Sequence, residues 1–177
     1  MSREPMPGES QAAQLRREFD GRFAAPRAKE VVQRVSLLTI RVGGDPFAVR
    51  LGEIQGVFCD RTIAPVPGPL AELLGVAAFR GSVVPVYDLR RFLGYEAGGS
   101  PRWMIVAAGA PVALAFDVLE RYLSAPSHAV VEHGGSGREH LRGALQAEGL
   151  TRLCVDVPSI VTAIRSRARS QGGQTGV

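Results

Sequence analysis

Cysteine is scarce in this sequence of 177 residues, which contains only Cys59 and Cys154. Both lie beside apolar residues, and neither belongs to a Cys-x-x-Cys pair or to another spacing typical of metal ligands. The sequence therefore predicts neither a disulfide framework nor a structural metal site.

Long hydrophobic runs are missing as well. The apolar stretch at residues 104–116 is interrupted by Gly109 and Pro111 and is shorter than the roughly 20 residues of a membrane-spanning helix. The first ten residues are polar and lack the apolar segment of a secretory signal. We expect a cytoplasmic protein with no direct membrane insertion.

Charge of one sign is not concentrated in the middle of the chain. The formal net charge is +4, but residues 35–164 carry 11 basic and 12 acidic side chains, so the excess lies at the two ends. Phosphate binding needs cations clustered on a folded surface. Aromatic residues make up only 6% and are not interleaved with cations. We expect no nucleic-acid partner, and a small barrel that binds nucleic acid is the least favoured function.

Catalytic and cofactor-binding motifs are also absent from the sequence, including Gly-x-Ser-x-Gly, the phosphate-binding Gly-x4-Gly-Lys-Ser/Thr loop and His-Glu-x2-His. His128, His133 and His140 have spacings that neither a helix nor a strand brings to one face, so they predict no metal site. We expect a protein that is not an enzyme and needs no cofactor.

Three aspartates, Asp88, Asp117 and Asp156, each follow an apolar run. A carboxylate at the end of a strand commonly accepts hydrogen bonds from the first amides of the next helical turn. We therefore expect helix capping from all three rather than acid or base catalysis.

The two ends of the chain lack strand patterning. In the N-terminal extension, residues 1–34, Leu15, Phe19 and Phe23 recur every four residues and so share one face of a short amphipathic helix. That face either packs on the protein's own body or binds a partner, and the sequence leaves both open. Residues 166–177 are predicted to form a basic, disordered tail.

The segment between the ends has the two-residue hydrophobic period of β-strands. Alternating apolar residues flank the turns at residues 43–45 and 109–110, which predicts two hairpins. The hairpins align at an offset of 65 residues, with Ala48 on Ala113, and Leu-Arg-Gly at 141–143 resembles Phe-Arg-Gly at 79–81. We interpret the chain as an internal duplication.

Each half has too few short strands for an open sheet with a core, but enough for a small closed barrel. We predict an all-β domain over residues 35–165, built of two pseudo-symmetric five-stranded β-barrels. These SH3-like lobes carry short helices, and the N-terminal amphipathic helix lies outside them.

An Arg-Gly turn stands out between the apolar runs of residues 73–94. Arg80 would lie at the rim of a barrel, where a guanidinium with five donors suits recognition of a carboxylate or of carbonyl groups on another protein. The alternative is an internal ion pair between Arg80 and Glu72 or Asp88.

The sequence of residues 73–89, Leu-Leu-Gly-Val-Ala-Ala-Phe-Arg-Gly-Ser-Val-Val-Pro-Val-Tyr-Asp-Leu, resembles the signature of the CheW adaptor family of bacterial chemotaxis. Residues 43–57 and 112–119 also resemble segments of that family, and the similarity covers about residues 35–165. The resemblance implies two pseudo-symmetric barrels and a non-enzymatic coupling protein. Its partners would be the regulatory domain of a CheA-type histidine kinase and the cytoplasmic hairpin of a chemoreceptor, which would recruit the protein to receptor clusters at the inner membrane face.

The resemblance also assigns the partner-binding residues, which are Ile54, Val57, Phe79, Arg80 and Gly81. This chain departs from the family at two further positions. Ala78 stands where Asn is common, and Gly56 stands where an acidic residue is common. The resemblance as a whole makes an adaptor that couples receptor to kinase the leading hypothesis. The two departures leave an alternative, a diverged module that binds another signalling protein, partly through the N-terminal helix.

Overall fold

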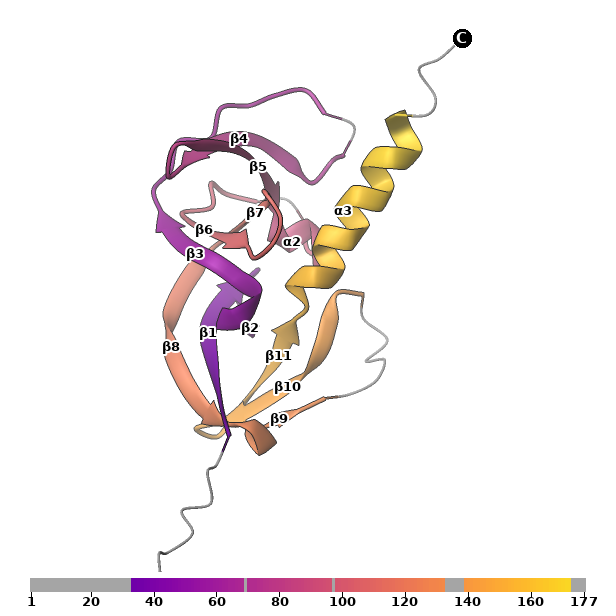
Figure 1. Ribbon diagram of the computed structural model, residues 1–177. Coiled ribbons are helices and arrows are strands. Elements are labelled where there is room, and N and C mark those ends of the chain that lie inside the picture. The colour runs from indigo at the N-terminus through magenta and orange to yellow at the C-terminus, as the bar shows by residue number, and fades with distance from the viewer. Residues whose placement is uncertain (1–32, 69, 97, 133–138, 173–177) are drawn as a thin grey trace, which may run out of the picture. The chain divides into compact units, whose positions relative to one another are not determined.

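The computed structural model of the protein describes residues 33–68, 70–96, 98–132 and 139–172 (Figure 1). The predicted helix with Leu15, Phe19 and Phe23 lies outside the described residues. The strands are β1 (Arg34–Val42), β2 (Asp45–Arg50), β3 (Ile54–Cys59), β4 (Leu73–Phe79), β5 (Ser82–Asp88), β6 (Trp103–Ala107), β7 (Ala113–Phe116), β8 (Val118–Pro126), β9 (Val130–Val131), β10 (Leu141–Ala147) and β11 (Leu150–Val155). The helical elements are the 3-10 turns η1 (Leu51–Glu53) and η2 (Ser127–Ala129), and the helices α2 (Leu89–Phe92) and α3 (Val157–Gly172).

The strands form two sheets, which confirms the predicted β-rich, two-lobed fold. Lobe A is the six-stranded sheet in the order β8-β1-β2-β11-β10-β9, and lobe B is the five-stranded sheet in the order β3-β6-β7-β5-β4. The sixth strand of lobe A is the two-residue β9. Both predicted hairpins are present, because β1 pairs antiparallel with β2 and β6 pairs antiparallel with β7.

The lobes are not consecutive halves of the chain. Strand β3 follows β2 but joins lobe B, and β8 follows β7 but joins lobe A. Each lobe therefore joins the first hairpin of one half of the duplication to the later strands of the other half, so that β1 and β2 lie with β8–β11 in lobe A and β6 and β7 lie with β3–β5 in lobe B. In both lobes the second strand of the predicted hairpin also pairs parallel with the last strand of the other half of the duplication, β2 with β11 and β7 with β5. Ala48 and Ala113 hold the same place in these ladders, as the offset of 65 residues predicts.

The alignment of residues 141–143 with residues 79–81 is wrong. Gly143 corresponds to Gly75, because each lies at the register shift of the first strand in its hairpin and each has positive φ. The counterpart of the Arg80-Gly81 turn is Glu148-Gly149, whose φ angles of 55° and 73° match the 48° and 83° of Arg80 and Gly81. The short Arg-Gly match alone could not distinguish a strand position from a turn position.

Buried side chains form three clusters. One lies within lobe A around Leu37, Ala48 and Leu145, and one within lobe B around Phe79 and Met104. The largest lies between the lobes and unites side chains of both sheets with those of α2 and α3. Central strands such as β1 and β6 contact a cluster on each face, which explains their nearly continuous apolar runs.

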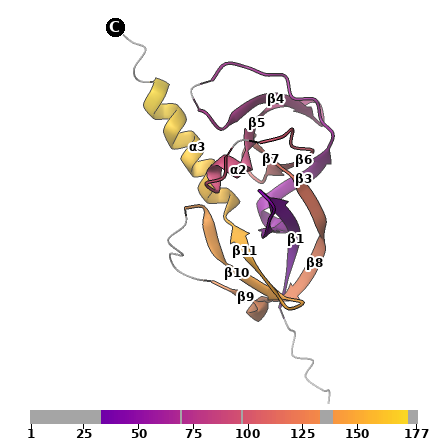
Figure 2. The same cartoon turned by 180° about the vertical axis from the view of Figure 1, so that it is seen from behind.

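Helix α3 continues into the segment predicted as a disordered basic tail, so that prediction is wrong for residues 166–172 (Figures 1 and 2). Val157, Ile160, Val161 and Ile164 are buried in the cluster between the lobes. One turn further on, Arg167 donates to Glu72 at 2.6 Å and lies 5.7 Å from the centroid of the Phe92 ring. The tertiary partners of Arg167 hold this arginine-rich segment as a helix.

Candidate functional site

The hairpin turn between β4 and β5 presents Arg80 at the end of lobe B. Both central residues, Arg80 and Gly81, have positive φ, as a two-residue turn of this hand requires. Phe79 and Ser82 pair across the turn. The Phe79 side chain is buried within lobe B, whereas Arg80 and Gly81 are exposed.

Aromatic rings support the Arg80 guanidinium from one side. Its Cζ lies 5.9 Å from the centroid of the Phe58 ring, and the Phe58 ring meets Phe79 edge-on with 4.8 Å between centroids. Arg61 lies against the same Phe58 ring, at 5.5 Å. Contacts of a cation with an exposed ring are weak, about 0.5–1 kcal/mol, but they orient the side chain.

The proposed internal partners of Arg80 are engaged elsewhere. Glu72 accepts a hydrogen bond from Arg167, and Asp88 accepts one from the backbone N–H of Arg90. Among the residues that the structure describes, Arg80 forms no ion pair. Its positive charge is therefore not compensated within this part of the chain.

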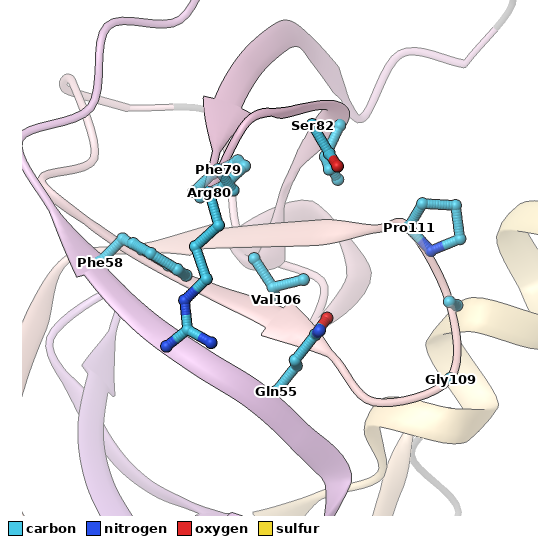
Figure 3. Close-up of a pocket in the computed structure, with 10 residues that line it drawn as sticks. Gln55, Phe58, Phe79, Arg80, Ser82, Val106, Gly109 and Pro111 are labelled. Atoms are coloured by element: carbon cyan, nitrogen blue, oxygen red, sulfur yellow. The ribbon is translucent and has the colours of Figure 1, made fainter.

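A cavity of about 450 Å³ opens beside Arg80 (Figure 3). Its walls come from β3, from the β4–β5 hairpin, and from β6 with the turn that follows. The lining residues are Gln55, Phe58, Phe79, Arg80, Ser82, Val84, Val106, Gly109, Ala110 and Pro111. Arg80 is the charged member of this mostly apolar set.

The structure divides the sequence-predicted partner residues between two places. Phe79, Arg80 and Gly81 lie together at the turn beside the cavity. Ile54 and Val57 instead pack against the cluster between the lobes, on the opposite face of β3. Sequence reasoning missed Phe58 and Gln55. Phe58 could have been found from strand alternation, because it follows Val57 and so faces the other side.

The two departures from the family pattern lie near this site. Ala78 is exposed on β4. A Cβ atom built on Gly56 would lie 3.9 Å from Nη2 of Arg80 and 3.1 Å from the Phe58 ring. An acidic side chain at position 56 would therefore reach the guanidinium, whereas Gly56 leaves it free.

The aspartates predicted as helix caps behave in two ways. Asp88 accepts from the backbone N–H of Arg90 at 3.0 Å, and Asp156 accepts from that of Ser159 at 3.0 Å, so both are caps. Asp117 is not, because it binds the backbone N–H of Gly43 at 2.7 Å and the Arg90 guanidinium. It joins the two lobes rather than starting a helix.

No group of three or more His, Cys, Asp or Glu side chains is arranged to hold a metal within the described ranges. The imidazole Nδ1 of His140 hydrogen bonds to the Ser159 hydroxyl at 2.9 Å, and His128 is exposed in η2. His133 lies outside the described residues.

A helix long and apolar enough to cross a membrane does not occur among the described residues.

In this architecture each β-sheet lobe combines strands from both halves of the duplication, and an exposed arginine lies beside an apolar cavity. Such a surface suits recognition of another protein. The CheW-like domain family matches residues 36–165, so the chain belongs to that family of non-enzymatic scaffold and adaptor proteins in chemotaxis-type signalling.

Individual relatives agree with this placement. The chain is 37% identical over 71 residues to Protein PilI of Pseudomonas aeruginosa, a match that spans 40% of each chain. Its fold is similar to that of the scaffolding protein TtCheW from Thermoanaerobacter tengcongensis, with a TM-score of 0.63 and 14% sequence identity. That match covers 70% of this chain and 89% of TtCheW.

Proposed function

We propose that this protein is an adaptor that couples a chemoreceptor to a CheA-type histidine kinase in a chemotaxis-like pathway. It would do so by binding the regulatory domain of the kinase and the cytoplasmic hairpin of the receptor, from the cytoplasmic side of the membrane. Membership of the CheW-like family supports the adaptor role.

The observation that carries the proposal is the exposed Arg80 guanidinium beside an apolar cavity. Interfaces bind through a few residues, with arginine and aromatic side chains enriched among them. Arg80, Phe58 and Phe79 combine these side chains at one end of lobe B. Ile54 and Val57 are half-buried on the opposite face of β3, where they support the strand that carries Phe58.

Binding of the full-length protein to each partner tests the proposal. We expect the wild type to bind the regulatory domain of its cognate kinase and a receptor hairpin in separate calorimetric titrations. Arg80→Glu reverses the charge at the site and should weaken binding to at least one partner by about 2–3 kcal/mol, because a charged hydrogen bond is lost. The proposal fails if the wild type binds neither partner, and equal binding by Arg80→Glu removes the role of Arg80.

A matched control is available at position 34. Arg34 is an arginine at the start of β1 in lobe A, and its guanidinium hydrogen bonds to the Ser124 carbonyl at 2.5 Å. Arg34→Glu makes the same change of charge away from the cavity. It should leave the affinity for both partners close to that of the wild type.

A further inference from the structure

Because the chain is an internal duplication, the residues beside the cavity of lobe B have counterparts in lobe A. Strand β3 has a register shift between Ile54 and Gly56, which leaves Gln55 as the extra residue. Strand β8 has the same shift opposite Thr39 and Ile40, with Glu120 as the extra residue between Leu119 and Arg121. Gln55 thus corresponds to Glu120, and Gly56 corresponds to Arg121.

The second hairpin of each lobe extends the correspondence. In lobe B, Val84 and Ala77 form the third residue pair counted from the turn at Arg80-Gly81. In lobe A, Arg152 and Leu145 form the third residue pair counted from the turn at Glu148-Gly149. Val84 therefore corresponds to Arg152, and Arg80 corresponds to Glu148.

In lobe A, these positions carry charges that compensate one another. Glu120 binds Arg41 at 2.8 Å and lies 3.7 Å from the guanidinium of Arg152, a residue with only 3% of its surface exposed. Arg121 forms an ion pair with Glu148 at the turn. The charged groups at this end of lobe A are thus paired within the protein.

In lobe B, only one of the corresponding positions carries a charge. Gln55 replaces Glu120, Val84 replaces Arg152, and Gly56 replaces Arg121, the residue that pairs with the turn. Arg80 remains, and the space is the apolar cavity of about 450 Å³. Arg61, whose Cζ lies 5.5 Å from the centroid of the same Phe58 ring, adds a second exposed cation that forms no ion pair among the described residues.

We propose that this cavity binds a partner segment in which an acidic side chain adjoins an apolar one. The apolar side chain fills the space between Phe58, Val84 and Val106, and the carboxylate accepts hydrogen bonds from Arg80. The partner's carboxylate thereby compensates the charge of Arg80, as Arg121 compensates the charge of Glu148 within lobe A. This inference rests on the proposed function, since it specifies the partner chemistry of the same site.

The lining favours such a segment over a phosphate backbone. A phosphate needs several donors and no apolar space, whereas the walls here are mostly hydrocarbon with a single guanidinium. A carboxylate matches the two parallel donors of an arginine, and the adjacent apolar side chain gains from leaving water.

The test places an internal carboxylate beside Arg80. Gly56→Glu in the full-length protein puts a carboxylate within reach of Nη2, and Gly56→Gln is the neutral control of almost the same shape. Both side chains meet the end of the Phe58 ring at about the same point, so packing changes cancel in the comparison. Gly56 does not have positive φ, so neither variant strains the backbone.

The first measurement uses two fluorescent nine-residue peptides with the central sequence Leu-Glu-Phe or Leu-Gln-Phe. We expect the wild type and Gly56→Gln to bind the acidic peptide about tenfold more tightly than the neutral one, a difference of about 1.4 kcal/mol. Gly56→Glu should lose that preference, because its own carboxylate competes for Arg80. Equal binding of the two peptides by the wild type, or tighter binding of a single-stranded oligonucleotide, would overturn the proposal.

The second measurement repeats the comparison with the kinase regulatory domain and the receptor hairpin. A loss of affinity in Gly56→Glu, but not in Gly56→Gln, supports the inference for the natural partner. If both variants bind the partners as the wild type does, the inference is wrong while the adaptor function stands. If the wild type binds neither partner but still prefers the acidic peptide, the adaptor function fails and the ligand chemistry of the cavity stands.

Discussion

At the scale of single residues, His140 shows how burial changes a side chain that the sequence places in a polar, glycine-rich stretch. Only 6% of its surface is exposed, and its ring packs edge-on against Phe92 with 5.6 Å between centroids. Its Nδ1 is bound to Ser159, whereas Nε2 has no hydrogen-bond partner within the described part of the chain. Burial lowers the pKa of His140, and the nearby Arg167 acts in the same direction against the opposing effects of Glu139 and Asp156.

This lowered pKa predicts a loss of stability in mild acid. Below about pH 6.5 the unfolded chain binds a proton at position 140 more readily than the folded protein does. The free energy of unfolding should therefore fall as the pH decreases from about 6.5 towards the lower folded pKa. Asn tolerates the positive φ of 66° at this position, so His140→Asn should fold and should lose this part of the pH dependence.

Urea unfolding at pH 7.5 and pH 5.5 checks the prediction. The exposed His128 provides the control, and His128→Asn should retain the pH dependence of the wild type. Identical pH dependence in His140→Asn and the wild type would contradict the argument, whatever the absolute stability of the variant.

At the scale of elements, the hairpin of β10 with β11 carries two glycines with positive φ in different surroundings. Gly143 lies in β10 with a φ of 80°, and a Cβ atom there would lie 2.5 Å from the carbonyl oxygen of Val131. Gly149, in the turn that ends the same strand, has a similar φ of 73° but has open space around the Cβ position. The two sites share their backbone strain and differ in steric contact.

We therefore expect Gly143→Ala to cost about 3 kcal/mol of stability, since it adds a collision with backbone to the strain of positive φ. Gly149→Ala should cost only about 1 kcal/mol, from the strain alone. Chemical denaturation of the two variants measures the difference. Similar losses would mean that β9 moves away from β10 without penalty.

The elements were predicted with uneven success, for a physical reason. The hairpins of β1 with β2 and of β6 with β7 follow from local alternation and turn residues, which the sequence shows directly. The placement of β3 in lobe B and of β8 in lobe A depends on contacts between distant segments, such as Thr39 with Arg121. The helical course of residues 166–172 likewise depends on Glu72, which lies far from Arg167 in the chain.

At the scale of the whole molecule, the two-lobed unit and the N-terminal extension can be tested separately. The cavity and Arg80 belong to the lobes, so we expect a chain lacking residues 1–30 to retain most of its affinity for the kinase regulatory domain. Calorimetric titration of the full and shortened chains measures this. A nearly complete loss of binding would support the alternative in which Leu15, Phe19 and Phe23 bind a different signalling partner.

Sequence alone was enough to predict the β-rich class, the duplication, the two hairpins, the caps at Asp88 and Asp156 and the position of the Arg80-Gly81 turn. These features depend on local periodicity and on residue types with strong conformational preferences, which act over a few neighbouring residues. The residues that share the cavity, the pairing of the arginines and the correspondence of the glycines became known only from the three-dimensional fold. Phe58 lies against Arg80 because segments distant in sequence meet in the folded chain. Gly56 is recognised as the counterpart of Arg121 only from the pairing of β3 with β6 and of β8 with β1, which joins residues far apart in the chain.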